Sequence, residues 1–91
     1  MRSDIKLALD LYVKDGVPTG GFLRAVLAND LMESLARADE YNKLDIFNIC
    51  HYIHWEIPAN SHGSYEIVAK WEERKQEEVK VFKYLEEESE K

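Results

Sequence analysis

Apolar residues recur every three or four positions along most of this sequence, which is the spacing of helices that bury one face. Glycine and proline interrupt the pattern near residues 16–21 and 58–64, and a softer break falls near residues 38–39. These breaks separate four predicted helices, over about residues 4–15, 21–37, 40–56 and 64–88. We therefore expect an all-α fold, a compact three- to four-helix array with a long C-terminal helix.

The first two predicted helices each carry an apolar stripe. The stripe of the first helix comprises Ile5, Ala8, Leu9 and Tyr12, and that of the second comprises Leu23, Val26, Leu27, Leu31 and Leu35. Ser3 is the expected N-cap of the first helix, and Gly16 fits the left-handed position that ends it.

Apolar residues cover most of the circumference of the third predicted helix: Leu44, Phe47, Ile49, Cys50, Ile53 and Trp55. Asp39 is its expected N-cap, and it must end before Pro58, because proline disfavours helical geometry in the preceding residue. Two arrangements fit this pattern. The helix lies at the centre of the fold, or half of it lies in the fold and half in a contact between subunits.

The fourth predicted helix is too long for a domain of this size. It would measure about 36 Å, whereas a compact domain of this length is about 25 Å across. We therefore expect a helical domain over residues 1–76 and a charged helical extension over residues 77–91. A strand over residues 79–85 is the alternative, although the flanking glutamates and lysines favour a helix. Because isolated helices are marginal, the apolar face of the extension predicts a homo-oligomer or a partner.

The composition narrows the classes of partner. Eighteen acidic residues against twelve basic ones give a net charge of −6, so direct nucleic-acid binding is not expected. The chain has one cysteine, which excludes an internal disulfide and suits a reducing compartment. Its first residues lack the features of a signal peptide, and no apolar run reaches the length of a membrane span. We expect a cytoplasmic protein that does not bind membranes.

Two glycine- and serine-rich turns precede predicted helices and could hold an anion. Thr19, Gly20 and Gly21 precede the second helix, with Arg24 one turn further, and Ser61 to Ser64 precede the fourth. Helix N-termini offer unpaired N–H groups and partial positive charge. Turns from neighbouring subunits could therefore hold a nucleotide. The simpler interpretation is that Thr19 and Ser64 are caps and the glycines are turn residues, since no Walker or GxGxxG motif is present.

Asp30 lies on the edge of the apolar stripe of the second predicted helix. A carboxylate there needs a partner, because unpaired burial is costly. Arg24, Arg37 and the N-terminus of another helix are the candidates, and a polar clasp between helices is the preferred interpretation.

Cysteine and histidine gather in the second half of the chain as Cys50, His51, His54 and His62. Cys50 and His54 lie four residues apart on one helical face, a spacing that can bind zinc. No HExxH or paired CxxC motif accompanies them, so we interpret them as partly buried histidines and an inert core cysteine, whose pKa burial would raise. No metal, cofactor or catalytic set is expected.

Aromatic residues are also frequent in the second half of the chain. Tyr52 and Trp55, three residues apart, could form an interface or a stacking platform for a base, and the default interpretation is core packing.

The stretch "GGFLRAVLANDLMESLARAD", followed by "NKLDIFNICHYIHWEIPANSHGS" and Trp71, resembles a group of small phage and prophage proteins. They share a turn plus "FLxAVLxNDL" pattern and an Ala–Asp step with an asparagine, here Ala38, Asp39 and Asn42. Pro-Ala and Gly-Ser turns follow, and the resemblance covers about residues 10–71. It implies a phage-encoded accessory protein without an assigned activity. Several small phage proteins counter bacterial defence systems.

Two functional hypotheses follow. The first is a non-enzymatic phage-encoded binding protein that inhibits or sequesters a host defence component through an acidic and aromatic surface. Its candidate contact residues are Tyr52, Trp55, Val79, Phe82 and Leu85. The alternative is an oligomeric sponge that binds a nucleotide signal, with candidate ligand-binding residues Thr19, Gly20, Gly21, Arg24, Ser61 and Ser64.

Overall fold

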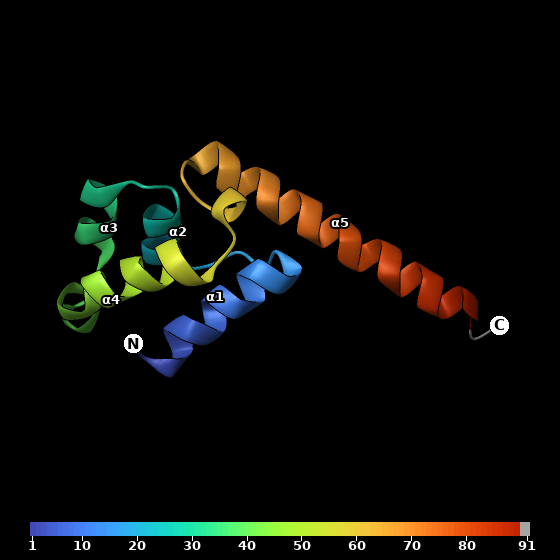
Figure 1. Ribbon diagram of the computed structural model, residues 1–91, viewed down its shortest axis with the longest axis horizontal. Helices are drawn as coiled ribbons and strands as arrows, with labels where there is room; N and C mark the ends of the chain where they lie inside the picture. Colours follow the sequence, from blue (N-terminus) through green and yellow to red (C-terminus); the bar gives the residue numbers. More distant parts are fainter. Residues whose placement is uncertain (90–91) are drawn as a thin grey trace.

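The computed structural model describes residues 1–89, and every regular element in this part of the chain is a helix (Figure 1). In chain order these are α1 (Ser3–Asp15), α2 (Gly21–Leu27), α3 (Leu31–Arg37), α4 (Glu40–Glu56), the short 3-10 helix η1 (Ala59–Ser61) and α5 (Tyr65–Ser89). The predicted all-α fold with a long C-terminal helix is confirmed, and the strand alternative over residues 79–85 is wrong. Residues 90 and 91 of the predicted extension lie outside the described residues. None of the described helices is both long and apolar enough to cross a bilayer.

The core lies where α1, α2, α4 and α5 meet, and two hydrogen bonds fix it at Tyr12. The Tyr12 side chain is fully buried, and its hydroxyl donates to the carbonyl oxygen of Ser61 at 2.6 Å. The carbonyl oxygen of Tyr12 accepts from the indole N–H of Trp71 at 3.0 Å. Each of the four helices adds apolar side chains to the same buried cluster, among them Leu9, Leu27, Ile49 and Val68.

The single helix predicted over residues 21–37 is wrong, because the chain turns at Asn29 and Asp30 and forms α2 and α3 instead. Asn29 has a left-handed backbone conformation with φ 61°, which asparagine tolerates better than most residues. Asp30 then caps α3 by accepting a hydrogen bond from the N–H of Glu33 at 3.2 Å. The turn takes the end of the predicted stripe out of the core, so Leu31 and Leu35 are exposed.

Helix α4 is buried along one side only. Asp39 caps it as predicted, accepting from the N–H of Asn42 at 2.7 Å. Ile49 and Ile53 are buried, whereas most of the other predicted core residues of this helix face solvent. The placement of this helix at the centre of the fold is therefore wrong, and it lies half in the fold.

Helix α5 starts in the core and then leaves it. The Ser64 hydroxyl accepts from the N–H of Ile67 at 3.1 Å, as predicted for a cap. Gly16 has φ 69° and ends α1 as predicted, whereas the predicted N-cap at Ser3 is wrong, because Arg2 precedes the helix and no side chain caps it. A Cβ at Gly16 would lie 2.7 Å from the carbonyl oxygen of Glu72. Close packing of α1 on α5 therefore requires glycine at this position.

Beyond this contact the distal half of α5 projects from the rest of the molecule (Figure 1). The helix has 25 residues and is about 37 Å long, and the molecule measures 52 × 26 × 21 Å. The side-chain N–H of Gln76 donates to the carbonyl oxygen of Gly16 at 2.9 Å, near the point where α5 leaves the core. The helix continues without a break across the predicted division between residues 1–76 and 77–91.

Candidate functional site

The first predicted anion-binding turn is part of the fold's own packing. Gly20, not Thr19, is the N-cap of α2, and no side chain caps this helix. The predicted cap at Thr19 is therefore wrong, because its hydroxyl donates to the carbonyl oxygen of Gly20 at 3.2 Å instead. Gly21 packs against Arg37, whose guanidinium nitrogen would lie 2.9 Å from a Cβ at Gly21. With seven residues, α2 is short.

The Arg24 guanidinium has a carboxylate partner inside the fold. One of its nitrogens donates to both carboxylate oxygens of Glu72, at 2.9 Å and 3.0 Å, and Glu72 is buried. Arg24 and Gly21 line a hollow of about 280 Å³ together with Asp30 and Glu33. Glu72 therefore already neutralises the cation that was expected to attract an anion, and Arg37, the second cation that lines this hollow, pairs with Glu33.

The second predicted turn is also used by the fold. Ser61 is fully buried, and its hydroxyl donates to the carbonyl oxygen of Pro58 at 2.6 Å. Its own carbonyl oxygen holds the Tyr12 hydroxyl, and Ser64 caps α5. Neither serine lines the hollow of Gly21 and Arg24, so one copy of the chain does not combine the two turns.

Asp30 forms the predicted polar clasp between helices. Of the three candidate partners it uses a helix N-terminus, that of α3. Its second carboxylate oxygen accepts from the Tyr65 hydroxyl at 2.7 Å, and this hydrogen bond raises the pKa of Tyr65. The carboxylate thus links α3 to the first turn of α5.

Cys50, His54 and His62 meet at a hollow of about 410 Å³ between α2, α4 and the turn before α5. Cys50, His51 and His54 are exposed and only His62 is partly buried, which corrects the interpretation as a core cysteine with partly buried histidines. Partial desolvation of the Cys50 thiol nevertheless raises its pKa, as expected. Burial, and to a lesser extent the charge of His54, lowers the pKa of His62. Among the described residues, no group of three or more His, Cys, Asp or Glu side chains is placed to hold a metal ion.

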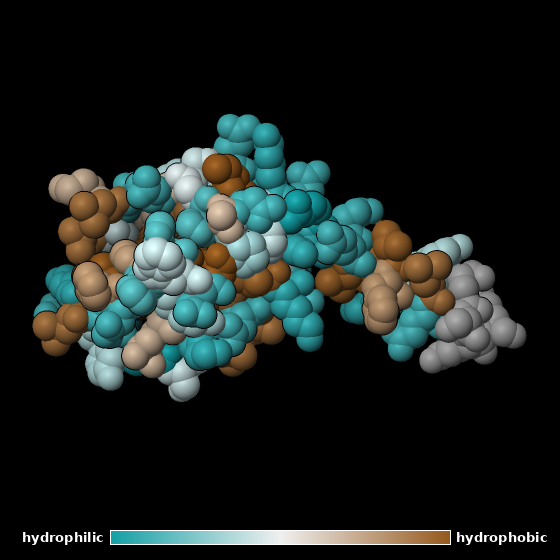
Figure 2. All heavy atoms as spheres, viewed as in Figure 1, coloured by the Kyte–Doolittle hydropathy of each residue, from teal (hydrophilic) through white to brown (hydrophobic). Residues whose placement is uncertain are grey.

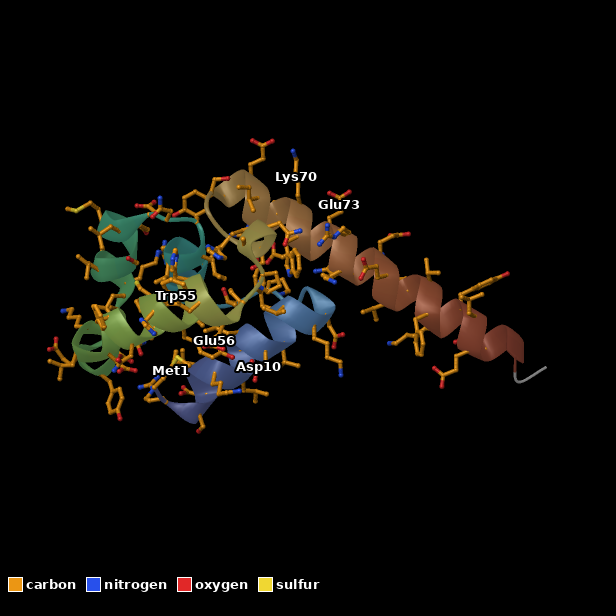
Figure 3. All side chains as sticks on the ribbon, viewed as in Figure 1. Met1, Asp10, Trp55, Glu56, Lys70 and Glu73 are labelled. Atoms are coloured by element: carbon orange, nitrogen blue, oxygen red, sulfur yellow. The ribbon has the colours of Figure 1, made fainter. Side chains whose placement is uncertain are left out.

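The outward side of α4 carries a ridge of aliphatic and aromatic side chains, which we call the α4 ridge: Leu44, Phe47, His51 and Trp55. Leu44, Phe47 and Trp55 are 89%, 77% and 67% exposed. The rings of Phe47 and His51 stack with centroids 6.2 Å apart, and those of His51 and Trp55 are 6.3 Å apart. Figure 2 shows apolar side chains at the end of the molecule formed by α3 and α4, and Figure 3 labels Trp55 on α4.

Tyr52 and Trp55 do not form the stacking platform considered from the sequence. The Tyr52 hydroxyl donates to the carboxylate of Asp10 on α1 at 3.1 Å, and its side chain is half-buried. Trp55 instead contacts the rings of His51 and His54, the latter edge-on with centroids 4.7 Å apart. Of this pair, only Trp55 is presented to a partner.

The distal part of α5 exposes the second apolar surface. Phe82 and Leu85 are 69% and 59% exposed, and Val81 and Tyr84 are exposed as well. Val79 is only half-exposed and lines a hollow of about 500 Å³ between α5 and the end of α1. Two of the three predicted contact residues on this helix, Phe82 and Leu85, are thus open to a partner.

Sequence reasoning missed two features of these surfaces. The ridge position of His51 could have been found from the spacing of residues 44, 47, 51 and 55 relative to Ile49 and Ile53. The exposure of Leu31 and Met32 on α3 follows only from the turn at Asn29.

No protein family, no curated protein and no solved structure matches this chain.

Proposed function

We propose that this protein is a non-enzymatic binding protein whose α4 ridge inserts into an apolar groove of a protein partner. The observation that carries the proposal is the spacing of Leu44, Phe47, His51 and Trp55 along the solvent side of α4. Positions i, i+3, i+7 and i+11 form one line along a helix. This is the arrangement by which an amphipathic helix anchors itself in a groove.

The geometry of α4 supports this role. At 100° per residue, Leu44, His51 and Trp55 lie within about 40° of one another and on the side opposite the buried Ile53. The core therefore holds the helix from behind while the ridge faces outward. A partner would dock onto a helix that is already formed, so binding orders little backbone. Trp55, at the C-terminal end of the ridge, is a residue type that often dominates binding energy at interfaces.

The charges around the ridge indicate the chemistry of the partner. Glu40, at the N-terminal end of α4, is exposed and pairs with Lys43 at 3.2 Å, and the whole chain has a net charge of −6. We therefore infer an apolar groove with a basic rim, since complementary charge speeds capture and orients the partner.

The resemblance to small phage proteins provides the biological setting of the proposal. On that basis we take the partner to be a host protein of a bacterial defence system, met in the host cytoplasm, which this protein inhibits or sequesters. The nucleotide-sponge hypothesis has less support, because Arg24 is paired with Glu72 and Ser61 is buried.

The test compares wild-type protein with the double variant Phe47→Glu/Trp55→Glu. Tagged wild-type protein is used to capture partners from host lysate, and affinity for the purified partner is then measured by calorimetry. We expect the double variant to bind at least about thirtyfold more weakly, because both changes place a charge in the groove. Leu7→Glu, at an exposed leucine on α1, is the matched control and should bind as wild type does.

Two results would contradict the proposal. One is a partner whose affinity is unchanged by the double variant. The other is calorimetric binding of a mono-, di- or cyclic nucleotide together with no retained protein, which would favour the sponge.

A further inference from the structure

On the side of α5 that faces away from α1, charged residues give way to apolar ones from the N-terminal to the C-terminal end of the helix. A hollow of about 680 Å³ runs along this side and is lined by α5 residues alone, so it has no opposing wall. Its N-terminal part has the basic Lys70 and Arg74 with Glu73 between them, its middle has Glu77 and Glu78, and its C-terminal part has the apolar Val81, Phe82 and Leu85. Lys70 and Glu73 project from this side in Figure 3, and Figure 2 shows the apolar side chains beyond them.

The N-terminal part of the same side contains a shallow depression. Asn60, Ile67, Lys70, Trp71 and Arg74 line this hollow of about 180 Å³. The Arg74 guanidinium lies 4.7 Å from the centroid of the Trp71 ring, where a cation is attracted to the ring face. Ile67 and Trp71 give the depression an apolar lining of the size that receives one aliphatic side chain.

We propose that two copies of this chain pair through this side of α5, with the helices antiparallel and Leu85 of each copy in the Ile67–Trp71–Arg74 depression of the other. This alignment places the two-fold axis near Glu78. Phe82 of each copy then lies near Arg74 of the other, within reach of its cationic group. The same surface is used twice, so the contact closes on itself and stops at a dimer.

The order of charges selects the antiparallel arrangement. The apolar segment is followed in sequence by Glu86 and Glu87. Antiparallel pairing brings this acidic end toward Arg74 of the other copy and toward Lys70, which also pairs with Glu66 of its own helix at 2.9 Å. Parallel pairing would place Lys70 beside Lys70 and the acidic ends beside each other, and like charges repel. Antiparallel helices also align their macrodipoles favourably.

Sedimentation equilibrium of the full chain from about 1 µM to about 500 µM tests the pairing. We expect wild-type protein to be a dimer at the upper end, and Phe82→Glu to weaken dimerisation at least tenfold while leaving the helical circular dichroism of the globule unchanged. Trp55→Glu, an equally exposed aromatic on α4, is the control and should dimerise as wild type does. Monomeric wild-type protein throughout, or a dimer insensitive to Phe82→Glu, would overturn the proposal.

A gain-of-function variant guards against effects of misfolding. Glu78 lies opposite its own copy at the two-fold axis, and it pairs with Lys75 of its own helix at 3.3 Å. Because this exposed pair contributes little, Glu78→Gln mainly removes the repulsion between the copies and should tighten the dimer several-fold. A weaker dimer would overturn this alignment.

Spin labels determine the orientation of the two helices. In a Cys50→Ser background, labels at Glu66→Cys should lie about 36 Å apart along the helix axis, and labels at Lys80→Cys about 6 Å apart along it. Parallel helices would bring both pairs to the same short separation, set by an interaxial distance of about 8–10 Å. Pulsed electron paramagnetic resonance measures these distances, and equal short distances at both positions would overturn the antiparallel arrangement.

Discussion

Helices α4 and α5 both present apolar side chains to solvent, but only α4 has a core behind the exposed side. Leu44 and Phe47 stand opposite the buried Ile49 and Ile53, so the globule holds α4 whether or not a partner is present. The turns of α5 around Phe82 lie beyond the contact of Gln76 with Gly16, and there α5 faces only the end of α1, across the hollow that Val79 lines. Exposure alone therefore does not define a role. The α4 ridge is already ordered before a partner binds, whereas the distal turns of α5 need a second surface to cover their apolar side chains and stabilise the helix.

The sharpest contrast lies between the two sides of α4 itself. We expect Ile53→Ala to lower the free energy of unfolding by about 2–5 kcal/mol, because it removes buried methyl groups and leaves a cavity. Phe47→Ala should change it by less than about 0.5 kcal/mol, since Phe47 packs against little in the globule. Urea denaturation measures both values. Comparable losses for the two variants would mean that the ridge is part of the core.

The distal part of α5 should be separable from the rest of the fold. Lys80→Pro removes a helical hydrogen bond and clashes with the preceding turn, at a local cost of about 3 kcal/mol. We expect it to abolish pairing of the copies while the unfolding midpoint of the globule stays within about 2 °C of that of monomeric Phe82→Glu. A large drop in that midpoint would show that the distal turns support the globule.

The ion pair of Arg24 with Glu72 joins α2 to the part of α5 that packs on the globule, one turn before Gln76. Glu72→Ala leaves the guanidinium without its carboxylate and should destabilise the protein by about 1–2 kcal/mol, a figure reduced because Arg24 is partly exposed to screening solvent. Glu73→Ala, at the exposed neighbouring residue, is the matched control. Thermal unfolding of the two variants side by side tests the difference, and equal midpoints would contradict it.

The smallest expected effect is a pH dependence of the free energy of unfolding, caused by His62 in the turn before α5. Its pKa is lowered in the folded protein, so the unfolded chain binds this proton more readily. Stability should therefore fall as the pH drops through about 6.5, the ordinary histidine value. His62→Gln should flatten this part of the profile of unfolding midpoint against pH. If the slope persists in the variant, other groups cause it.

Local signals in the sequence predicted much of the fold. Gly16, Asp39 and Ser64 were identified as helix ends because each acts within one turn of its own position. The division of residues 21–37 was missed because Leu31 and Leu35 continue the helical spacing of the stripe. The adjacent Asn29 and Asp30 both favour turns, and their local preference ended the helix despite the continuing apolar spacing.

Which side chains are exposed or already paired could not be predicted, because this depends on contacts between residues far apart in the sequence. Arg24 and Glu72 are 48 residues apart, and nothing near Arg24 indicates that its charge is already neutralised. The composition of α4 predicted an apolar helix, but only the packing of Ile49 and Ile53 determines which side remains outside. For the same reason Cys50 was assigned to the core and lies at the surface.

The two tryptophans of the chain give each region its own optical reporter. Trp71 is buried on the core side of α5, in its second turn, and Trp55 is exposed to water on α4. Their emission should differ in wavelength and in quenching by acrylamide, so docking at one surface would shift one signal and leave the other in place. Unlabelled protein could thus report which of its two apolar faces has been covered.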